Sequence, residues 1–210
     1  SPYKRDFIEP GELGQGLPDA PHVIYLQGME VEAIDADTLA MVQKPYFNRT
    51  WRTFNSHEHS PSSFEQAYPG VLQKDQAIYF SQPMFEQYND NAPHWCKQLL
   101  RNAILRLLPK PLVQHDGPST ANLLLLHQPQ QKRYILHVLN YVPVRRGQLD
   151  IIEDIHPALD LNITLHTPNK ITQASLAPDD TPVDLKDNDG GAQLNLPQLD
   201  GYAVIALNYA

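Results

Sequence analysis

The sequence predicts an α+β protein, in which a partial α/β segment is followed by an antiparallel β-sandwich. Three observations lead to this prediction. Helical periodicity covers residues 92–108, short β-rich runs bounded by turn residues recur from residue 119 onward, and prolines crowd the intervening residues 109–118. Because domain boundaries fall in segments of this kind, we expect one domain over residues 1–110 and a second over residues 111–210.

Composition limits the classes of protein to which the chain can belong. Its 210 residues are 41% hydrophobic and 19% charged, with a formal net charge of −8. This acidic balance disfavours a nucleic-acid partner, because affinity for phosphate needs clustered Lys and Arg. No apolar run approaches the ~20 residues of a membrane span, and the single cysteine cannot form a disulfide within the chain. The 19 prolines argue against long uninterrupted helices.

The first residues carry no recognisable targeting segment. They read Ser1-Pro-Tyr-Lys-Arg-Asp, without an initiating Met and without a basic stretch followed by an apolar one. Together with the lone Cys96, which suits a reducing compartment, this predicts a cytoplasmic protein. A longer parent protein with a cleaved signal stays open as the alternative. The Asn-x-Thr triplets at Asn48 and Asn162 are expected to be unmodified.

The first half predicts short strands before a helix. Residues 1–20 are rich in Pro, Gly and acids and predict an extended loop. Residues 45–63 mix aromatic, basic and His side chains without a period and predict a long structured loop. Residues 70–81 fit a hairpin with a Lys-Asp turn. Further short strands are predicted at residues 22–27, 29–34 and 38–42.

A single apolar stripe predicts the helix over residues 92–108. Asn91 is the expected N-cap, and Pro93 suits the first turn. Arg106 suits the negative end of the helix dipole, and Pro109 ends the helix. The stripe consists of Trp95, Leu99, Leu100, Ala103, Ile104, Leu107 and Leu108.

The second half predicts a sandwich of short antiparallel strands. Leu161, Ile163 and Leu165 alternate with polar residues, which is typical of a strand with one buried face. Turn residues separate the runs at intervals typical of β-sandwiches. The predicted strands are residues 120–128, 133–142, 159–166, 171–178, 182–186, 192–197 and 201–209.

The densest group of possible metal ligands is His57-Glu58-His59. On a strand, His57 and His59 would share one face and could bind one metal ion through two imidazoles. A zinc site normally needs three or four protein ligands, and spacing marks no third. Structural loop histidines are therefore the favoured interpretation, and we expect no metal and no cofactor.

Two other groups are candidates for contacts with ligands or subunits. Arg49 and Trp51 lie in the aromatic and basic loop, and such residues anchor carbohydrate or subunit contacts. Arg145 and Arg146 form a basic turn, which is interpreted either as a solvated hairpin end or as a subunit or interdomain ion-pair site. The ligand or interface candidates are thus Arg49, Trp51, His57, His59, Arg145 and Arg146.

No catalytic residue is predicted in this chain. Cys96 falls within the predicted helix beside Trp95, so a partly buried structural role is expected. Glu153 and Asp154 are adjacent, whereas glycosidase carboxylates act from about 5–9.5 Å apart across a substrate.

Four segments taken in order carry a family resemblance. They are PYFNRTWRTFNSHEHSPSS, YPGVLQKDQAIYFSQPMFEQY, NAPHWCKQLLRNAILRLLP and KRYILHVLNYVPVRRGQLDIIEDIHP. Together they resemble the C-terminal part of large bacterial glycoside hydrolases, the β-galactosidase-like or α-L-fucosidase-like group. In that group a catalytic (β/α)8 barrel comes first, an amidotransferase-like trimerisation domain follows, and a small β-sandwich closes the chain.

The resemblance implies a role for each half of the chain. Residues 1–110 would be the later part of the flavodoxin-like, amidotransferase-like domain, and residues 111–210 the terminal sandwich. The catalytic barrel would lie upstream, so no catalytic residue carries over. Amidotransferase activity is not expected, because His57-Glu58-His59 does not match the His-x-Glu pair of true amidotransferases and Cys96 is not on a strand-to-helix turn.

The main hypothesis is a non-catalytic C-terminal accessory region of a bacterial glycoside hydrolase. Its partners would be the upstream barrel and further copies of the same chain. The alternative is a carbohydrate-binding module, which rests on the aromatic residues of 45–54 and on the sandwich. A third hypothesis is a metal-dependent enzyme built on His57 and His59.

Overall fold

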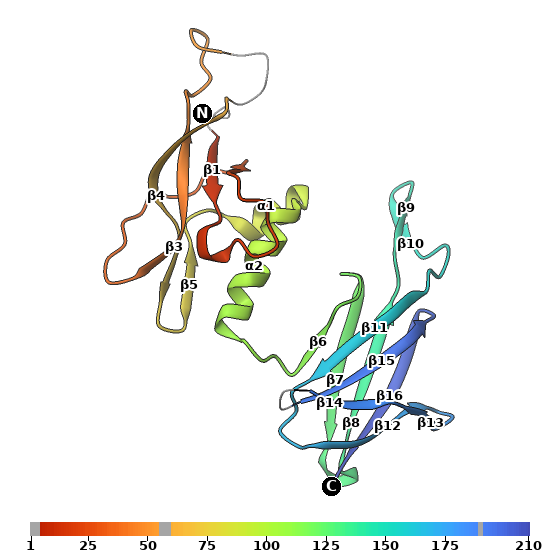
Figure 1. Cartoon of the computed structure of the whole chain (residues 1–210). Coiled ribbons are helices and arrows are strands. Elements are labelled where there is room, and N and C mark those ends of the chain that lie inside the picture. The colour runs from red at the N-terminus through yellow and green to blue at the C-terminus, as the bar shows by residue number, and fades with distance from the viewer. Residues whose placement is uncertain (1–4, 55–59, 189–190) are drawn as a thin grey trace. The chain divides into compact units, whose positions relative to one another are not determined.

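The computed structural model describes residues 5–54, 60–188 and 191–210 (Figure 1). The backbone divides into two compact units, one reaching to Pro109 and the other beginning at Lys110. Each unit has its own hydrophobic core, and each is described here by itself.

The first unit is built on one antiparallel sheet with the strand order β2-β1-β3-β4-β5. The 3-10 helix Gly11–Leu13 follows β1, and the helices α1 and α2 follow β5. The strands are β1 Asp6–Glu9, β2 His22–Ile24, β3 Asp37–Pro45, β4 Ser62–Lys74 and β5 Ala77–Phe80, and the helices are α1 Met84–Asn91 and α2 His94–Leu107.

The direction of these strands corrects the predicted flavodoxin-like, amidotransferase-like α/β segment. Among the described residues of this unit, every strand pair runs antiparallel. A flavodoxin-like sheet needs parallel strands joined by long crossovers, whereas Lys74 of β4 is joined to Ala77 of β5 by a tight turn. The unit keeps the predicted mixture of strands and helix, but not the parallel topology.

Most of the short elements predicted for this unit are present. The hairpin over residues 70–81 is confirmed by β4 and β5, and β3 contains the strand predicted at 38–42. The strand predicted at 29–34 does not form. Instead, the Met29 amide donates a 2.9 Å hydrogen bond to the Ser81 carbonyl, just beyond β5.

The helix predicted over residues 92–108 is α2, with corrected ends. Asn91 does not cap it, because Asn91 is the last residue of α1, a helix that the sequence did not predict. The N-cap is Pro93, and the last helical residue is Leu107, one residue before the predicted end. Of the predicted stripe, Leu99, Leu100 and Ala103 join a core with β-strand residues, whereas Ile104 and Leu108 are more than half exposed. The core includes Ile8, Leu39, Val42, Val71, Cys96, Leu99, Leu100 and Ala103.

The second unit is a β-sandwich of two antiparallel sheets, as predicted. The strand orders are β14-β15-β11-β6 and β13-β12-β16-β8-β7. Strands β9 Val144–Arg146 and β10 Leu149–Ile151 pair in a separate hairpin. The sandwich strands are β6 Val113–His115, β7 Ala121–Gln128, β8 Arg133–Asn140, β11 Ala158–Leu165, β12 Ile171–Ala177, β13 Thr181–Val183, β14 Leu185–Asn188, β15 Gly191–Leu199 and β16 Tyr202–Tyr209.

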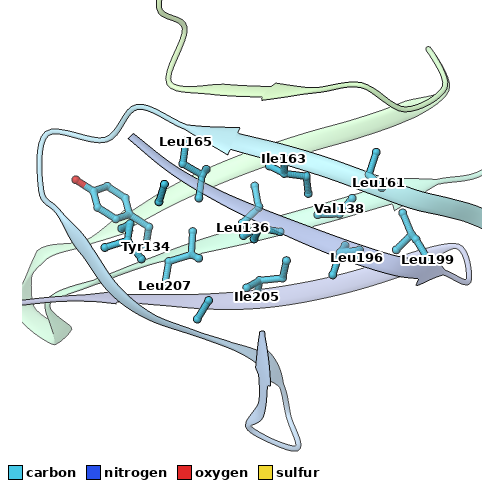
Figure 2. Close-up of a cluster of buried hydrophobic side chains, with 14 of the residues drawn as sticks. Tyr134, Leu136, Val138, Leu161, Ile163, Leu165, Leu196, Leu199, Ile205 and Leu207 are labelled. Carbon is cyan, nitrogen blue, oxygen red and sulfur yellow. The ribbon is translucent and has the colours of Figure 1, made fainter. Parts of the chain in front are cut away.

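The core of the sandwich explains why its strands can be recognised in the sequence. Figure 2 shows Ile163 and Leu165 of β11 on one sheet together with Leu136 of β8 and Ile205 of β16 on the other. All four side chains are completely buried. Because alternate residues of a strand point to opposite faces, one buried face imposes the apolar-polar alternation seen in the sequence.

Candidate functional site

The loop after β3 presents exposed aromatic side chains. Trp51 is 82% exposed and Phe54 is 69% exposed, and the Arg52 guanidinium carbon lies 4.5 Å from the centre of the Trp51 ring. The backbone beneath them is ordered by a turn, in which the Thr50 hydroxyl oxygen accepts hydrogen bonds from the amides of Arg52 and Thr53. An aromatic-cationic pair held in this way is a suitable anchor for a protein or carbohydrate partner.

Of the other candidates in this loop, the structure describes Arg49 but not His57 or His59. Arg49 is partly exposed and already interacts within the chain. His57 and His59 lie outside the described residues, so the metal hypothesis built on them stays a prediction. Among residues 5–54, 60–188 and 191–210, no group of three or more His, Cys, Asp or Glu side chains could hold a metal ion.

Arg145 and Arg146 lie on the β9–β10 hairpin, which extends from the sandwich (Figure 1). Arg145 pairs with Asp150 at 3.5 Å, and Arg146 forms an ion pair with Glu153. Both arginine side chains stay more than half exposed. The predicted basic turn is therefore a hairpin end whose arginines are engaged within the hairpin region.

The same hairpin region exposes a group of large apolar side chains. A two-stranded hairpin is at best marginally stable in water by itself, so exposed apolar residues on it favour a contact with another polypeptide surface. We call this group the hairpin arm. It comprises Leu149 (69% exposed), Ile151 (39%), Ile152 (51%) and Ile155 (54%).

Cys96 and Glu153, for which no catalytic role is predicted, make structural contacts. Cys96 is completely buried, and burial raises the pKa of its thiol to about 12, so it stays protonated at neutral pH. Its Sγ lies 3.4 Å from the Met84 carbonyl oxygen, which links α2 to α1. The Glu153 carboxylate is held by the Arg146 guanidinium.

A polar hollow in the sandwich was not predicted from the sequence. It has a volume of about 600 Å³ and lies where the chain passes from β13 to β14. On its wall the Asn195 amide donates to Asp160 Oδ1 at 2.7 Å and to Asn162 Oδ1 at 3.0 Å. Lys186 also lines it. Fixed amide and carboxylate groups in a concave surface can bind a hydroxylated ligand.

A second carboxylate, that of Asp116 just after the end of β6, supports this network. The Asp116 carboxylate accepts hydrogen bonds from both the side-chain amide and the backbone amide of Asn162, and these bonds hold the pKa of Asp116 below its usual value. The sequence does contain a pattern that points to a polar surface. Asp160 and Asn162 are separated by one apolar residue on β11, and Gln193 and Asn195 are separated by one apolar residue on β15. Only the pairing of β11 with β15 shows that they meet.

The described helices lack the combination of length and apolar character needed to cross a membrane.

No family model matches the sequence, and no curated protein is found to be similar to it.

Among solved structures, the chain is similar to alpha-L-fucosidase isoenzyme 2 from Paenibacillus thiaminolyticus. The TM-score is 0.91 and the sequence identity is 31%. The similarity covers 100% of this chain and 32% of that enzyme, so the chain spans about a third of the enzyme's length.

Proposed function

We propose that this chain is a non-catalytic accessory region of an α-L-fucosidase-like glycoside hydrolase, where it supports oligomer formation and the catalytic barrel. The observation that carries the proposal is the similarity of the whole chain to one third of an alpha-L-fucosidase, at 31% identity. It favours the fucosidase-like over the β-galactosidase-like branch of the predicted resemblance.

The chemistry of the described residues supports a non-catalytic role. Cys96 is a buried thiol, and Glu153 is paired with Arg146. Glu153 and Asp154 are neighbours in sequence, and neither lines the polar hollow. The chemistry of hydrolysis is thus assigned to the part of the parent enzyme that this chain does not include.

The exposed surfaces support a role in contacts between polypeptides. The hairpin arm carries isoleucines that water solvates poorly, and the loop at Trp51 carries an aromatic-cationic pair. Exposed apolar patches mark interaction surfaces, and tryptophan and arginine are enriched at protein interfaces. We assign both surfaces to contacts with the barrel or with further copies of the chain.

A hydrolysis assay tests the non-catalytic role. The purified 210-residue chain is incubated with aryl α-L-fucosides and aryl galactosides, and release of the aryl group is compared with a matched blank. We expect no release above the blank. Turnover proportional to protein concentration would overturn the proposal.

A sedimentation experiment tests the contact role of the hairpin arm. Ile152→Lys places a charge on the arm, and Ile34→Lys places the same charge on an 81% exposed isoleucine of the first unit. If the arm mediates association, Ile152→Lys shifts the chain toward monomer and Ile34→Lys does not. Equal effects of the two variants would count against an interface at the arm.

The polar hollow favours a second candidate function, carbohydrate binding by the sandwich. Asp160, Asn162 and Asn195 present the fixed acceptors and donors that a sugar hydroxyl needs. Calorimetric titration with fucose, galactose and small oligosaccharides tests it, with Asn195→Ala as the variant that removes the bridging amide. Absence of heat at millimolar sugar would exclude this function.

A further inference from the structure

The sandwich protects all of its described sheet edges except β7. The edges of the two sheets are β14, β6, β13 and β7. β6 and β13 have three residues each, and β13 contains a proline. β14 has four residues and carries Lys186 and Asp187. Short strands, prolines and charges are the features that keep sheet edges from pairing with other chains.

Strand β7 has none of these protections. Its eight residues Ala121–Gln128, ANLLLLHQ, include no proline, lysine, arginine or acid. It pairs with β8 in an unbroken register from Ala121↔Asn140 to Gln128↔Arg133, without a bulge that would bend the edge away. Within the part of the chain that the structure describes, no strand pairs with its other side. That side therefore presents alternate amides and carbonyls, which can form a new ladder.

The outward face of β7 carries two leucines at its centre and the amides Asn122 and Gln128 on either side of them. Leu124 is 54% exposed and Leu126 is 43% exposed. The cross-strand neighbours on this face extend two rows over the sheet. Leu126 of β7 pairs with Ile135 of β8, and Leu124 of β7 pairs with His137 of β8, which pairs in turn with Val204 of β16. These rows contain no acid. In a chain with a net charge of −8, β7 is thus an edge where two copies can approach without carboxylate repulsion.

We propose that β7 pairs antiparallel with β7 of a second copy of this chain, around a two-fold axis at Leu125. The inference rests on the proposed role in oligomer formation and names the surface that performs it. The strand is self-complementary in this register: Leu124 faces Leu126 of the partner subunit, and Asn122 faces Gln128 of the partner subunit. On the outward face, leucine meets leucine and amide meets amide, and each pair recurs on both sides of the axis, as in an isologous contact.

Sedimentation velocity of the full chain and its variants tests the pairing, over about 1–200 µM. The wild-type chain is expected to form a dimer in a concentration-dependent way. Leu124→Lys is expected to raise the dissociation constant at least tenfold, because it places a lysine on each side of the two-fold axis, opposite Leu126 of the partner subunit. Leu159→Lys, at a leucine of β11 that is 68% exposed, is the matched control and is expected to leave the constant unchanged.

A double variant tests the register. The double variant Leu124→Lys/Leu126→Glu places opposite charges face to face across the axis in the proposed register. Its dissociation constant is therefore expected to return to within about threefold of the wild-type value. In a register shifted to pair Leu124 with itself, two lysines meet and no recovery follows. Circular dichroism confirms folding of each variant, and Leu126→Lys replaces Leu124→Lys if that variant fails to fold.

The outcomes separate this inference from the proposed function. A chain that stays monomeric throughout the range, or a dimer that responds equally to Leu124→Lys and Leu159→Lys, overturns pairing through β7. A dimer lost only in Ile152→Lys places the contact on the hairpin arm, which also overturns the inference but supports the role in oligomer formation. The hydrolysis assay judges the non-catalytic role independently of these results.

Discussion

The Tyr68 hydroxyl donates a 2.9 Å hydrogen bond to Oδ2 of Asp6 and thereby joins β4 to β1 across the intervening β3. The Gln82 amide donates to the same hydroxyl at 2.9 Å. Lys44 of β3 completes the group, with its ammonium 3.6 Å from the Asp6 carboxylate and 4.6 Å from the centre of the Tyr68 ring. Burial and the Asp6 carboxylate both raise the pKa of Tyr68, so the phenol stays a donor at neutral pH.

Removal of this donor is predicted to destabilise the first unit. Tyr68→Phe keeps the ring but leaves the buried Asp6 carboxylate without its hydroxyl partner, which is expected to lower the free energy of unfolding by about 1–3 kcal/mol. Urea denaturation measures the change. Tyr79→Phe, at a tyrosine 46% exposed on β5, is the control and is expected to have little effect. Equal stability of Tyr68→Phe and wild type would refute a stabilising role for the hydrogen bond.

The stability of the chain is predicted to depend on the protonation of His22. This side chain of β2 stacks on Trp95 of α2, with ring centres 5.6 Å apart, and burial lowers its pKa below the usual 6.5. Protons therefore bind more readily to His22 in the unfolded chain. Its contribution to the free energy of unfolding is complete above about pH 6.5 and is lost as the pH falls toward the folded-state pKa.

A variant isolates this effect from the other histidines. His22→Phe keeps an aromatic ring against Trp95 but cannot titrate. Urea denaturation at a series of pH values from 8 to 5 is expected to show a steeper loss of stability for wild type than for His22→Phe. Parallel curves for the two proteins would show that His22 does not contribute.

The Cys96 thiol is predicted to react only after unfolding. It is completely buried, and its pKa of about 12 leaves little thiolate at pH 8. Native chain treated with an aromatic disulfide reagent at this pH is expected to stay unmodified on the timescale in which chain unfolded in guanidinium reacts fully. Equally rapid modification of the native chain would mean that the contact between α1 and α2 opens readily.

The elements that could be predicted are those with one continuous buried face. Leu99 and Ala103 give α2 its stripe, and Ile163 and Leu165 give β11 its alternation, because each element buries one side against a core. α1 lacks such a signal, since its buried residues are only Met84 and Gln87.

Strand direction in the first unit could not be predicted from local patterns. β1 has four residues, and its place in the sheet is fixed by the pairing of Ile8 with Val42 and of Phe7 with Val23. Pairings between segments distant in sequence leave no periodic trace in either segment. The family resemblance implied a flavodoxin-like segment, and the observed antiparallel pairs correct it.

The candidate surfaces, too, could be predicted only where they depend on a single segment of the sequence. An exposed Trp51 in an aperiodic loop could be predicted, because nothing in the segment provides a buried face. The polar hollow could not, since Asp116, Asn162 and Asn195 come together only through the pairing of β6, β11 and β15. In the sequence, Asn162 belongs to an Asn-x-Thr triplet and to the polar side of an alternating strand, and neither pattern points to the hollow.

A side chain at Gly28 is predicted to destabilise the first unit by displacing the chain from the end of β5. A Cβ at this position would lie 2.2 Å from the Ser81 carbonyl oxygen and 2.4 Å from Oε1 of Gln82. Ser81 cannot easily retreat, because its amide donates to the Gly70 carbonyl at 2.9 Å while its own carbonyl accepts from Met29.

Gly28→Ala is therefore expected to lower the free energy of unfolding by about 1–3 kcal/mol, the usual range for an overpacked site. Gln27→Ala, at the exposed neighbouring residue, controls for a change of side chain in the same segment and is expected to be nearly neutral. Thermal and urea denaturation of both variants measure the difference. If Gly28→Ala and Gln27→Ala unfold alike, the segment before Met29 is free to move away from Ser81, and its close approach does not stabilise the unit.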